Sequence, residues 1–434
     1  MIKKYYKYIL LFLFFLFILI VFSNNGNDTI WNYGMAHAIR MGEVPYKDFN
    51  IISTPLYAFV MSLGLFIKDT YFIFILEQAF LLTIFIFFVE KLVNRNYILV
   101  LISLCFPIFN LLFPNYNFLV LLLLTIIIYL EKQNKSDSII GITLGLLFLS
   151  KHTIGGFIII ASMISTLNVK RGLKRLLFSL IPISIFIIYL LCTKSLYAFF
   201  DLSILGLFDF GNHNSSISVF SIIASICILI YVIMSIKKDC KNKYIYYLFG
   251  SMIFIIPICD LFHVFYLICF FLIIYFIDKE EIPKNSIKKI GLIFIPLILI
   301  LNFISNYEYI SNISINNNSE KFKSNLLTNN IKIYIQIIKK KYQSYNNAYM
   351  ISMSSMFFDI ECGNKITYFD VPLHGNFGYN GIEKMKNKIS KSHDSYFFIQ
   401  DSNNVQFANE LNDYIRSNYK FIEKIEDFEI YYIK

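Results

Sequence analysis

The chain has 434 residues, of which 57% are hydrophobic and 18% aromatic, and its mean hydropathy is +0.59. These values exclude an ordinary soluble protein, whose apolar residues must be offset by polar surface. A net charge of +10 would suggest a nucleic-acid partner for a soluble protein, but here the basic residues gather in short loops between apolar runs, where cytoplasmic placement favours them. The composition therefore predicts a polytopic α-helical membrane protein that binds the lipid bilayer and no nucleic acid.

The first apolar run follows a basic flank, MIKKYYKY, and no small-residue cleavage site comes after it. We expect an uncleaved signal anchor with a cytoplasmic N-terminus. Further runs of nearly spanning length recur along the chain. They bring the prediction to about eleven transmembrane helices, at residues 8–22, 71–90, 97–113, 117–130, 139–150, 154–167, 176–192, 217–236, 244–259, 262–277 and 290–304.

Residues 23–54 form the one long polar segment in the first hundred residues, and they directly follow the first span. The segment starts with the carboxylate of Asp28 and continues as an amphipathic helix, with Trp31, Met35, Ala38 and Ile39 on one face. Gly42 can end this helix, and a turn follows at Pro45, Tyr46, Lys47 and Asp48. We expect an external loop that lies against the outer face of the membrane.

Residues 54–67 are apolar, but the run has only fourteen residues and falls short of the roughly 30 Å hydrocarbon core. The charge of the loops also indicates that this run does not cross the membrane. If this run does not cross, nineteen basic residues lie in inside loops and five outside before residue 305; if it crosses, sixteen of the nineteen move outside. The positive-inside rule therefore predicts an interfacial helix at 54–67.

We expect a membrane domain over residues 1–304 and a polar domain over residues 305–434, which eleven crossings place outside the cytoplasm. Strand-like and helical runs alternate in the second domain and predict a small α/β fold. The expected strands are 347–352, 365–370, 395–400 and 429–434, and the expected helices include 324–342, 380–389 and 405–419. The GYNG run at 378–381 lacks the spacing of a nucleotide-binding fingerprint.

Asp28 is the first candidate for chemistry, because a carboxylate just beyond a span can ionise in water and act as a general base or a metal ligand. The alternative is that Asp28 caps the helix that follows it. Asp48 lies twenty residues later, and the intervening turn could bring both carboxylates to one site. Alternatively, Lys47 and Asp48 are solvated contacts to lipid headgroups.

The segment NDTIWNYGMAHAIRMGEVPYKDFNIISTPLYAF resembles the first external loop of the GT-C membrane glycosyltransferases, in particular relatives of protein mannosyltransferases and of the aminoarabinose transferase of lipid A. Asp28 falls on the catalytic aspartate of that group, and LGLLFLSKHTIGG resembles its lysine-containing break between two later spans. The remaining matches are Gly42, Pro45, Tyr46, Asp48, Phe49, Pro55, Leu56 and Tyr57. Thr29 stands where the group usually has an acidic neighbour, which leaves the second catalytic carboxylate and the use of a divalent metal open.

The resemblance implies an inverting transfer of a sugar from a polyprenyl-phosphate donor to a lipid, glycan or protein acceptor of the cell envelope, on the outer face of the plasma membrane. Such a reaction needs a base for the acceptor proton and a cation for the departing phosphate. We assign the base to Asp28 and the cation to Lys151, assisted by His152; the alternative for Lys151 is snorkelling to the interface. Tyr46, Lys47 and Asp48 are the expected substrate contacts in the first loop.

Two further sets of polar residues lie on the predicted outer side. Asp260 and His263 have i, i+3 spacing, which suits one face of a metal or substrate site, or a single hydrogen-bonded pair in a solvated turn. Asp201, Asp209 and His213 either contact sugar or acceptor or are ordinary loop residues. Two other functions remain as alternatives, a transporter or flippase and a polymerase of lipid-linked surface polysaccharide. We find no internal repeat, as transporters usually have, and the polar residues gather on one side, which favours an enzyme.

Overall fold

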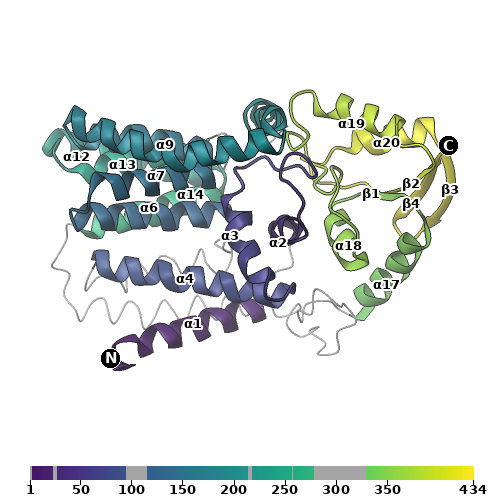
Figure 1. Ribbon diagram of the computed structural model, residues 1–434, viewed down its shortest axis with the longest axis horizontal. Coiled ribbons are helices and arrows are strands. Elements are labelled where there is room, and N and C mark those ends of the chain that lie inside the picture. Colours follow the sequence, from purple (N-terminus) through teal and green to yellow (C-terminus); the bar gives the residue numbers. More distant parts are fainter. Residues whose placement is uncertain (1, 23–26, 94–114, 214–217, 257, 278–328) are drawn as a thin grey trace. The chain divides into compact units, whose positions relative to one another are not determined.

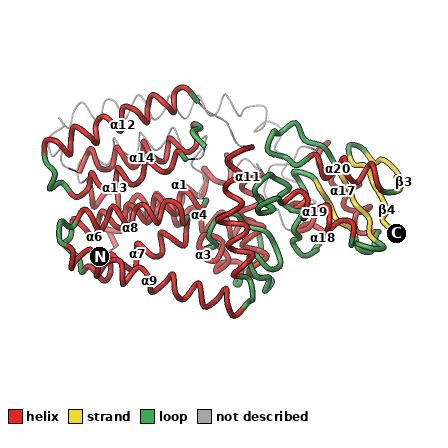
Figure 2. The backbone as a smooth tube through the Cα atoms, turned by 90° about the horizontal axis from the view of Figure 1, so that it is seen from above, coloured by secondary structure: helices red, strands yellow, loops and turns green. Residues whose placement is uncertain are grey.

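The computed structural model describes residues 2–22, 27–93, 115–213, 218–256, 258–277 and 329–434. Within them the chain is mostly helical, with one small sheet near the C-terminus (Figure 2). The expected spans at 97–113 and 290–304, and the expected domain boundary at 304/305, lie outside the described residues. Among the described residues, three helices are long and apolar enough to cross a membrane, at Tyr71–Val93, Val169–Cys192 and Val219–Lys238.

The chain divides into two compact units. Unit 1 comprises residues 1–23, 75–188 and 215–308, and unit 2 comprises residues 24–74, 189–214 and 309–434. The segment at 27–74, which contains the loop predicted to be external, and the segment around residue 200 therefore belong to the same unit as the C-terminal domain. Sequence alone does not indicate this grouping, because long apolar stretches separate the three segments.

Unit 1 is a bundle of apolar helices, most of which begin or end within a few residues of the apolar runs in the sequence (Figure 1). The Glu90 carboxylate, near the end of the helix at Tyr71–Val93, accepts a hydrogen bond from the Tyr8 hydroxyl in the helix at Ile2–Phe22, at 2.9 Å. The helices of this unit are α1 (Ile2–Phe22), most of α4 (Tyr71–Val93), α6 (Tyr116–Lys132), α7 (Asp137–Ser150), α8 (His152–Ser165), most of α9 (Val169–Cys192), α12 (Val219–Lys238), α13 (Lys243–Ser251), the 3₁₀ turn η3 (Met252–Ile255) and α14 (Leu261–Ile277).

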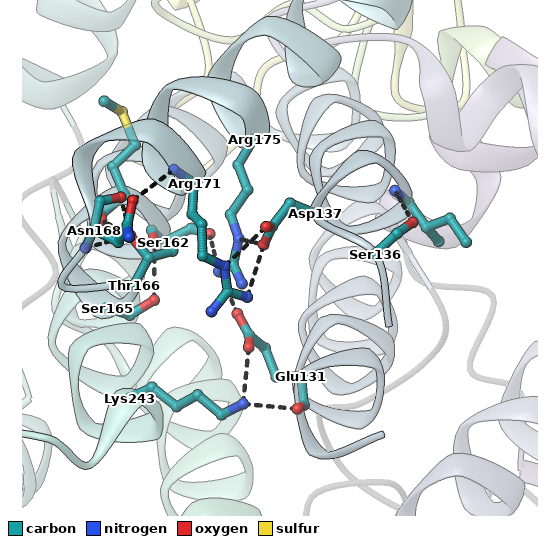
Figure 3. Close-up of polar contacts among 12 residues, drawn as sticks. Glu131, Ser136, Asp137, Ser162, Ser165, Thr166, Asn168, Arg171, Arg175 and Lys243 are labelled. Atoms are coloured by element: carbon teal, nitrogen blue, oxygen red, sulfur yellow. Dashed lines mark hydrogen bonds and ion pairs between the residues drawn. The ribbon is translucent and has the colours of Figure 1, made fainter. Parts of the chain in front are cut away.

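The largest charged cluster of unit 1 ties five of these helices together at one end of the bundle (Figure 3). Arg175 of α9 is only 1% exposed and forms ion pairs with Glu131 of α6 and Asp137 of α7, the latter at 2.7 Å. Arg175 also donates to Ser162 of α8 and to the Tyr247 hydroxyl of α13, each at 3.1 Å. Every charge in this cluster has an opposite partner, so we interpret it as a structural staple.

The staple extends outward through two more basic side chains. Lys243 lies 3.0 Å from the second carboxylate oxygen of Glu131, and Arg171 contacts both oxygens of Asp137, at 2.9 and 3.0 Å. Gly145 of α7 faces the backbone of α9 so closely that a β carbon would overlap Ser179 and Pro182. The glycine therefore allows α7 and α9 to approach at the distance that the ion pairs require.

Unit 2 combines the first external loop with an α/β domain. Its loop elements are α2 (Asn27–Arg40), α3 (Leu56–Leu65), α10 (Leu196–Phe199), the π-helix η2 (Phe200–Leu205) and α11 (Gly206–His213). Its domain elements are α17 (Asn329–Ser344), β1 (Ala348–Ile351), α18 (Ser355–Cys362), α19 (Gly381–Ser390), β2 (Ser395–Ile399), α20 (Asn409–Asn418), β3 (Lys420–Ile425) and β4 (Phe428–Ile433). The ten residues of α3 extend about 15 Å, half of a hydrocarbon core.

The sheet has strand order β1-β2-β4-β3, with β1 parallel to β2 and the other pairs antiparallel. Helices α19 and α20 cover one face, where Phe397 and Ile399 of β2 join Leu411 of α20 in the core. On the other face, Phe398 of β2 packs against Tyr342 of α17, and Phe358 of α18 packs against Phe428. Both faces of the central strands are buried, which explains their continuous apolar runs.

The expectations for the domain are partly confirmed. Strands form at three of the four predicted runs, and helices α19 and α20 form where periodicity predicts them. The strand expected at 365–370 is wrong: Asp370 accepts the Thr367 amide, and the Thr367 hydroxyl accepts the Phe369 amide, which closes a turn there. The sequence did not predict β3, because its charged and largely exposed residues lack an apolar face.

Replacing Arg175 with alanine should lower the free energy of unfolding of the full chain by about 3–5 kcal/mol, because Glu131 and Asp137 lose the buried guanidinium that pairs with both of them. Thermal unfolding in detergent measures the effect as a lower midpoint. Lys174 of the same helix is exposed, and its replacement with alanine is the matched control. Equal midpoints for the two variants would contradict the interpretation of the cluster as a staple.

Candidate functional site

Asp28 lies in the first turn of α2, and its side chain is exposed. A carboxylate at this position interacts favourably with the positive end of the helix dipole. The backbone carbonyl of Asp28 accepts a hydrogen bond from the side-chain amide of Asn32 at 2.6 Å. Because α2 begins at Asn27, Asp28 lies inside the first turn and is not the N-cap residue that the sequence analysis considered; its exposed carboxylate remains accessible to a substrate.

Helix α2 packs against α3 and α18 and is largely covered by protein. Trp31 and Ala38, which the sequence placed on a membrane-facing stripe, are buried within unit 2, and Met35 and Ile39 are partly buried. Gly34 lies against Met356 of α18 with no room for a β carbon. The α/β domain thus holds the helix that carries Asp28 in its first turn.

A buried polar group that the sequence analysis missed links α2 to the start of α4. His37 Nδ1 lies 2.8 Å from Asp69, and the Tyr33 hydroxyl donates to the same carboxylate at 3.2 Å. Burial alone would raise the pKa of Asp69, but the hydrogen bond and charge of His37 outweigh it, so the pKa is lowered. Tyr33 and His37 are four residues apart on one helix face, which was the available signal; nothing in the sequence pointed to Asp69 as their partner.

The turn after α2 uses its polar side chains for its own structure. The Asp48 carboxylate accepts the Val44 amide at 2.7 Å, and Tyr46, with a φ of 69°, donates its hydroxyl to the Ser53 carbonyl at 2.8 Å. The Tyr46 ring also packs on Phe199. Of the three residues predicted to contact substrate here, Lys47 alone has an exposed side chain.

Asp28 and Asp48 lie at opposite ends of α2. The ten residues from Asp28 to Ala38 span about 15 Å along the helix axis, and the Glu43 amide donates to the Ala38 carbonyl at 2.9 Å, which fixes the turn beside the C-terminal end. The turn does not bring the two carboxylates into one site. Asp28 is left as the candidate base, and Asp48 as a residue that stabilises the turn.

In unit 1, Lys151 occupies the break between α7 and α8. Its backbone is extended, with φ of −154° and ψ of 103°. Its ammonium donates to Asn117 Oδ1 at 2.9 Å and lies 5.5 Å from the centre of the Tyr116 ring. Burial lowers the pKa of Lys151 to about 8, although the charge of Asp260 opposes that shift. The ammonium therefore has one neutral hydrogen-bond acceptor and a more distant carboxylate.

The N-terminus of α8 adds further positive character beside Lys151. Lys151 is the N-cap residue and no side chain caps the helix; the first amide to bond within it is that of Gly155, at 2.9 Å from the Lys151 carbonyl. The amides of Thr153 and Ile154, in the first turn, thus have no acceptor within the helix. Asn117 is fully buried, and its Nδ2 has no hydrogen-bond partner among the described residues. These donors, with the ammonium, could bind an anion.

His152 and His263 have different surroundings. His152 is buried in the first turn of α8. His263 Nδ1 and the His263 amide both lie 2.8 Å from Asp260 Oδ1, so Asp260 caps the start of α14 and orients the imidazole. The pair is the hydrogen-bonded turn that the sequence analysis considered. In the described part of the chain, no group of three or more His, Cys, Asp or Glu side chains is arranged to hold a metal ion.

The polar residues near position 200 bind the α/β domain. Asp201 lies 2.6 Å from the Lys384 ammonium, Asp209 accepts the Asn380 amide at 3.1 Å, and His213 stacks on His374 with ring centres 3.9 Å apart. Gly378, with a φ of 80°, faces Asp201 closely enough to exclude a side chain. The GYNG run is therefore a docking turn for η2 and α11, a third role that the sequence analysis did not consider.

Comparison with known proteins adds no assignment. No protein-family model, no curated protein and no solved structure matches the chain. Functional interpretation therefore depends on the residues themselves, chiefly Asp28 in unit 2 and Lys151 with its neighbours in unit 1.

Proposed function

We propose that the chain is an integral-membrane glycosyltransferase of the GT-C type, which transfers a sugar from a polyprenyl-phosphate donor to a cell-envelope acceptor. The observation that supports it best is the anion-binding arrangement at Lys151. In the part of the chain that the structure describes, the Lys151 ammonium with one neutral acceptor, the amides at the N-terminus of α8 and the buried side-chain amide of Asn117 all offer donors to an anion. A phosphate on a lipid suits such a site in an apolar helical bundle.

In the proposed reaction, Asp28 accepts the proton of the acceptor hydroxyl as the oxygen attacks the anomeric carbon. The bond between that carbon and the phosphate oxygen breaks, and the polyprenyl phosphate leaves with the electron pair. Inversion follows from a single displacement. Lys151 and the α8 amides are the donors that unit 1 offers to a lipid phosphate. His152, at the start of α8, lies beside these amides in the chain.

The same proposal includes about eleven membrane crossings, with a cytoplasmic N-terminus and an extracytoplasmic α/β domain. The three long apolar helices, the ten-residue length of α3 and the basic loops support this topology. Of the alternatives, a flippase would also need an anion site for a lipid phosphate, but it would need no base. Asp28 therefore distinguishes the two functions.

Substituting asparagine for Asp28 should leave the protein at its normal level in the membrane and reduce sugar transfer by 10²-fold or more, because asparagine cannot take up a proton. A deletion strain that carries the variant gene is compared with one that carries the wild type, by mass analysis of surface glycans and undecaprenyl-linked sugars. Asp239→Asn, in an exposed loop, is the control. Full transfer by the Asp28→Asn variant would exclude Asp28 as the base.

The apparent kcat/KM for the donor should fall as pH rises through about 8, because Lys151 of the free enzyme loses the proton that attracts the phosphate. Lys151→Gln should lower kcat/KM by about 10²–10³-fold. Lys151→Arg keeps its charge at these pH values, so its residual activity should lack the decline near pH 8. A decline that persists in this variant would assign it to another group.

Cysteine labelling tests the topology in intact cells. A cysteine introduced at Asn387 of α19, which is exposed, should react with a membrane-impermeant maleimide. Cys240, exposed between α12 and α13, should react only after lysis, because its loop is predicted to face the cytoplasm. Asn387→Cys is tested in a chain without the seven native cysteines, and Cys240 in a chain without the other six. The opposite labelling pattern would overturn the proposed orientation.

A further inference from the structure

The α/β domain contains a pocket of about 520 Å³ where α17 ends and β1 begins. This volume lies within the range of small-molecule sites, roughly 300–1,000 Å³. Its walls come from the end of α17, the start of β1, the end of α18 and the loop that follows α18. Nothing in the proposed transfer reaction uses these residues.

The lining is polar, and it offers both donors and acceptors. Amide side chains come from Gln343, Asn347 and Asn364, and tyrosine side chains from three positions that include Tyr345 and Tyr349. An amide or a hydroxyl can donate and accept hydrogen bonds at the same time. A fatty or otherwise apolar ligand would leave these groups without partners, at a cost of about 1–3 kcal/mol each. The pocket therefore suits a ligand with many hydroxyl or amide groups.

The charges at the pocket disfavour an anion. Asp359 lines it, is 1% exposed, and accepts hydrogen bonds from the Tyr342 hydroxyl at 2.8 Å and the Asn364 amide at 3.2 Å. Asp370, also 1% exposed, adjoins Asp359. Burial raises the pKa of both carboxyls, and the charge of Asp359 raises that of Asp370 further.

The single lysine of the lining does not reverse this balance. Lys365 interacts with the carboxylate of Glu43, which is 6% exposed and also accepts the Ile366 amide. Burial raises the pKa of Glu43 to about 7, and Lys365 opposes the shift, which places the two groups close to one another. A phosphate or a nucleotide would thus meet a pair of buried carboxyl groups and a lysine whose charge is partly balanced by Glu43.

We propose that this pocket binds an uncharged sugar residue of a glycan. A pyranose ring presents several hydroxyls to the amide and tyrosine groups, and its C–H faces can lie against a tyrosine ring. Binding at this pocket requires no transferase activity, so it stands or falls separately from the proposed reaction.

The pocket is also connected to the first external loop within unit 2. The loop after α18 contacts the turn at 43–48 through Glu43 and through Tyr368, whose hydroxyl donates to the Lys47 carbonyl. Asn50 Nδ2 lies 3.4 Å from the Tyr368 carbonyl. A sugar bound against Asn364 and Lys365 therefore lies beside a chain segment that is held by the loop of Asp28.

Saturation-transfer NMR on the full chain in lipid nanodiscs, without glycosidic detergent, tests the proposal. The probes are glucose, galactose, N-acetylglucosamine and their β-linked disaccharides. At least one should bind, and Gln343→Ala, at an exposed position, should weaken that binding at least fivefold. Tyr345→Ala should do the same. Tyr379, 48% exposed and outside the pocket, provides the matched control, because Tyr379→Ala should bind as the wild type does.

Three results would overturn the proposal. The first is that no probe binds to the folded wild-type chain. The second is that Gln343→Ala and Tyr345→Ala bind as tightly as Tyr379→Ala, which would place the sugar elsewhere. The third is that inorganic phosphate displaces the bound sugar, which would make the pocket an anion site. A fourth result would also count against it, namely that Tyr345→Ala loses binding while Gln343→Ala keeps it. Tyr345 packs on Tyr396 and bonds to Glu423, so its replacement can act through folding.

Discussion

A charge among apolar helices must have a partner, and two cations in the described part of unit 1, the buried Arg175 and the partly buried Lys151, meet this constraint differently. Arg175 contacts two carboxylates, a serine and a tyrosine, which saturate its guanidinium. Lys151 has one neutral amide oxygen and a more distant aspartate. The first arrangement is complete without any ligand, so we regard it as structural. The second retains donors for an anion, and it is therefore the better candidate for function.

Hydropathy predicted the helices of unit 1 well, because burial in a bundle and insertion in a membrane both demand long apolar runs. Charge partners were not predictable in the same way. Arg175 and Glu131 are 44 residues apart and come from two different predicted loops. The predicted spans leave both residues in loops expected to face the cytoplasm. Only the packing of α6 against its neighbours shows that their side chains are buried.

In unit 2, local patterns predicted elements better than side-chain roles. The turn at 45–48 and the helix before it form as expected, with Gly42 at a φ of 84° just after the helix. The sequence suggested that Asp48 contacts substrate, but its carboxylate closes the turn, because the nearest free amide, that of Val44, lies within reach. The strand expected at 365–370 failed for a similar reason, since Asp370 binds a local amide instead of leaving it for a neighbouring strand. Short polar side chains compete with regular structure in both cases.

Unit 2 is assembled from segments that leave the ribosome at very different times. Helix α2 is synthesised early, yet its packing partner α18 begins at Ser355, more than three hundred residues later. Until Met356 and Ile360 arrive, Gly34 has no side chain of α18 to pack against. A chain that stops short of that point can insert its helices but cannot fold its first loop. The loop that carries Asp28 is thus completed only when synthesis of the whole protein is nearly finished, which makes the C-terminal domain a checkpoint on the integrity of the chain.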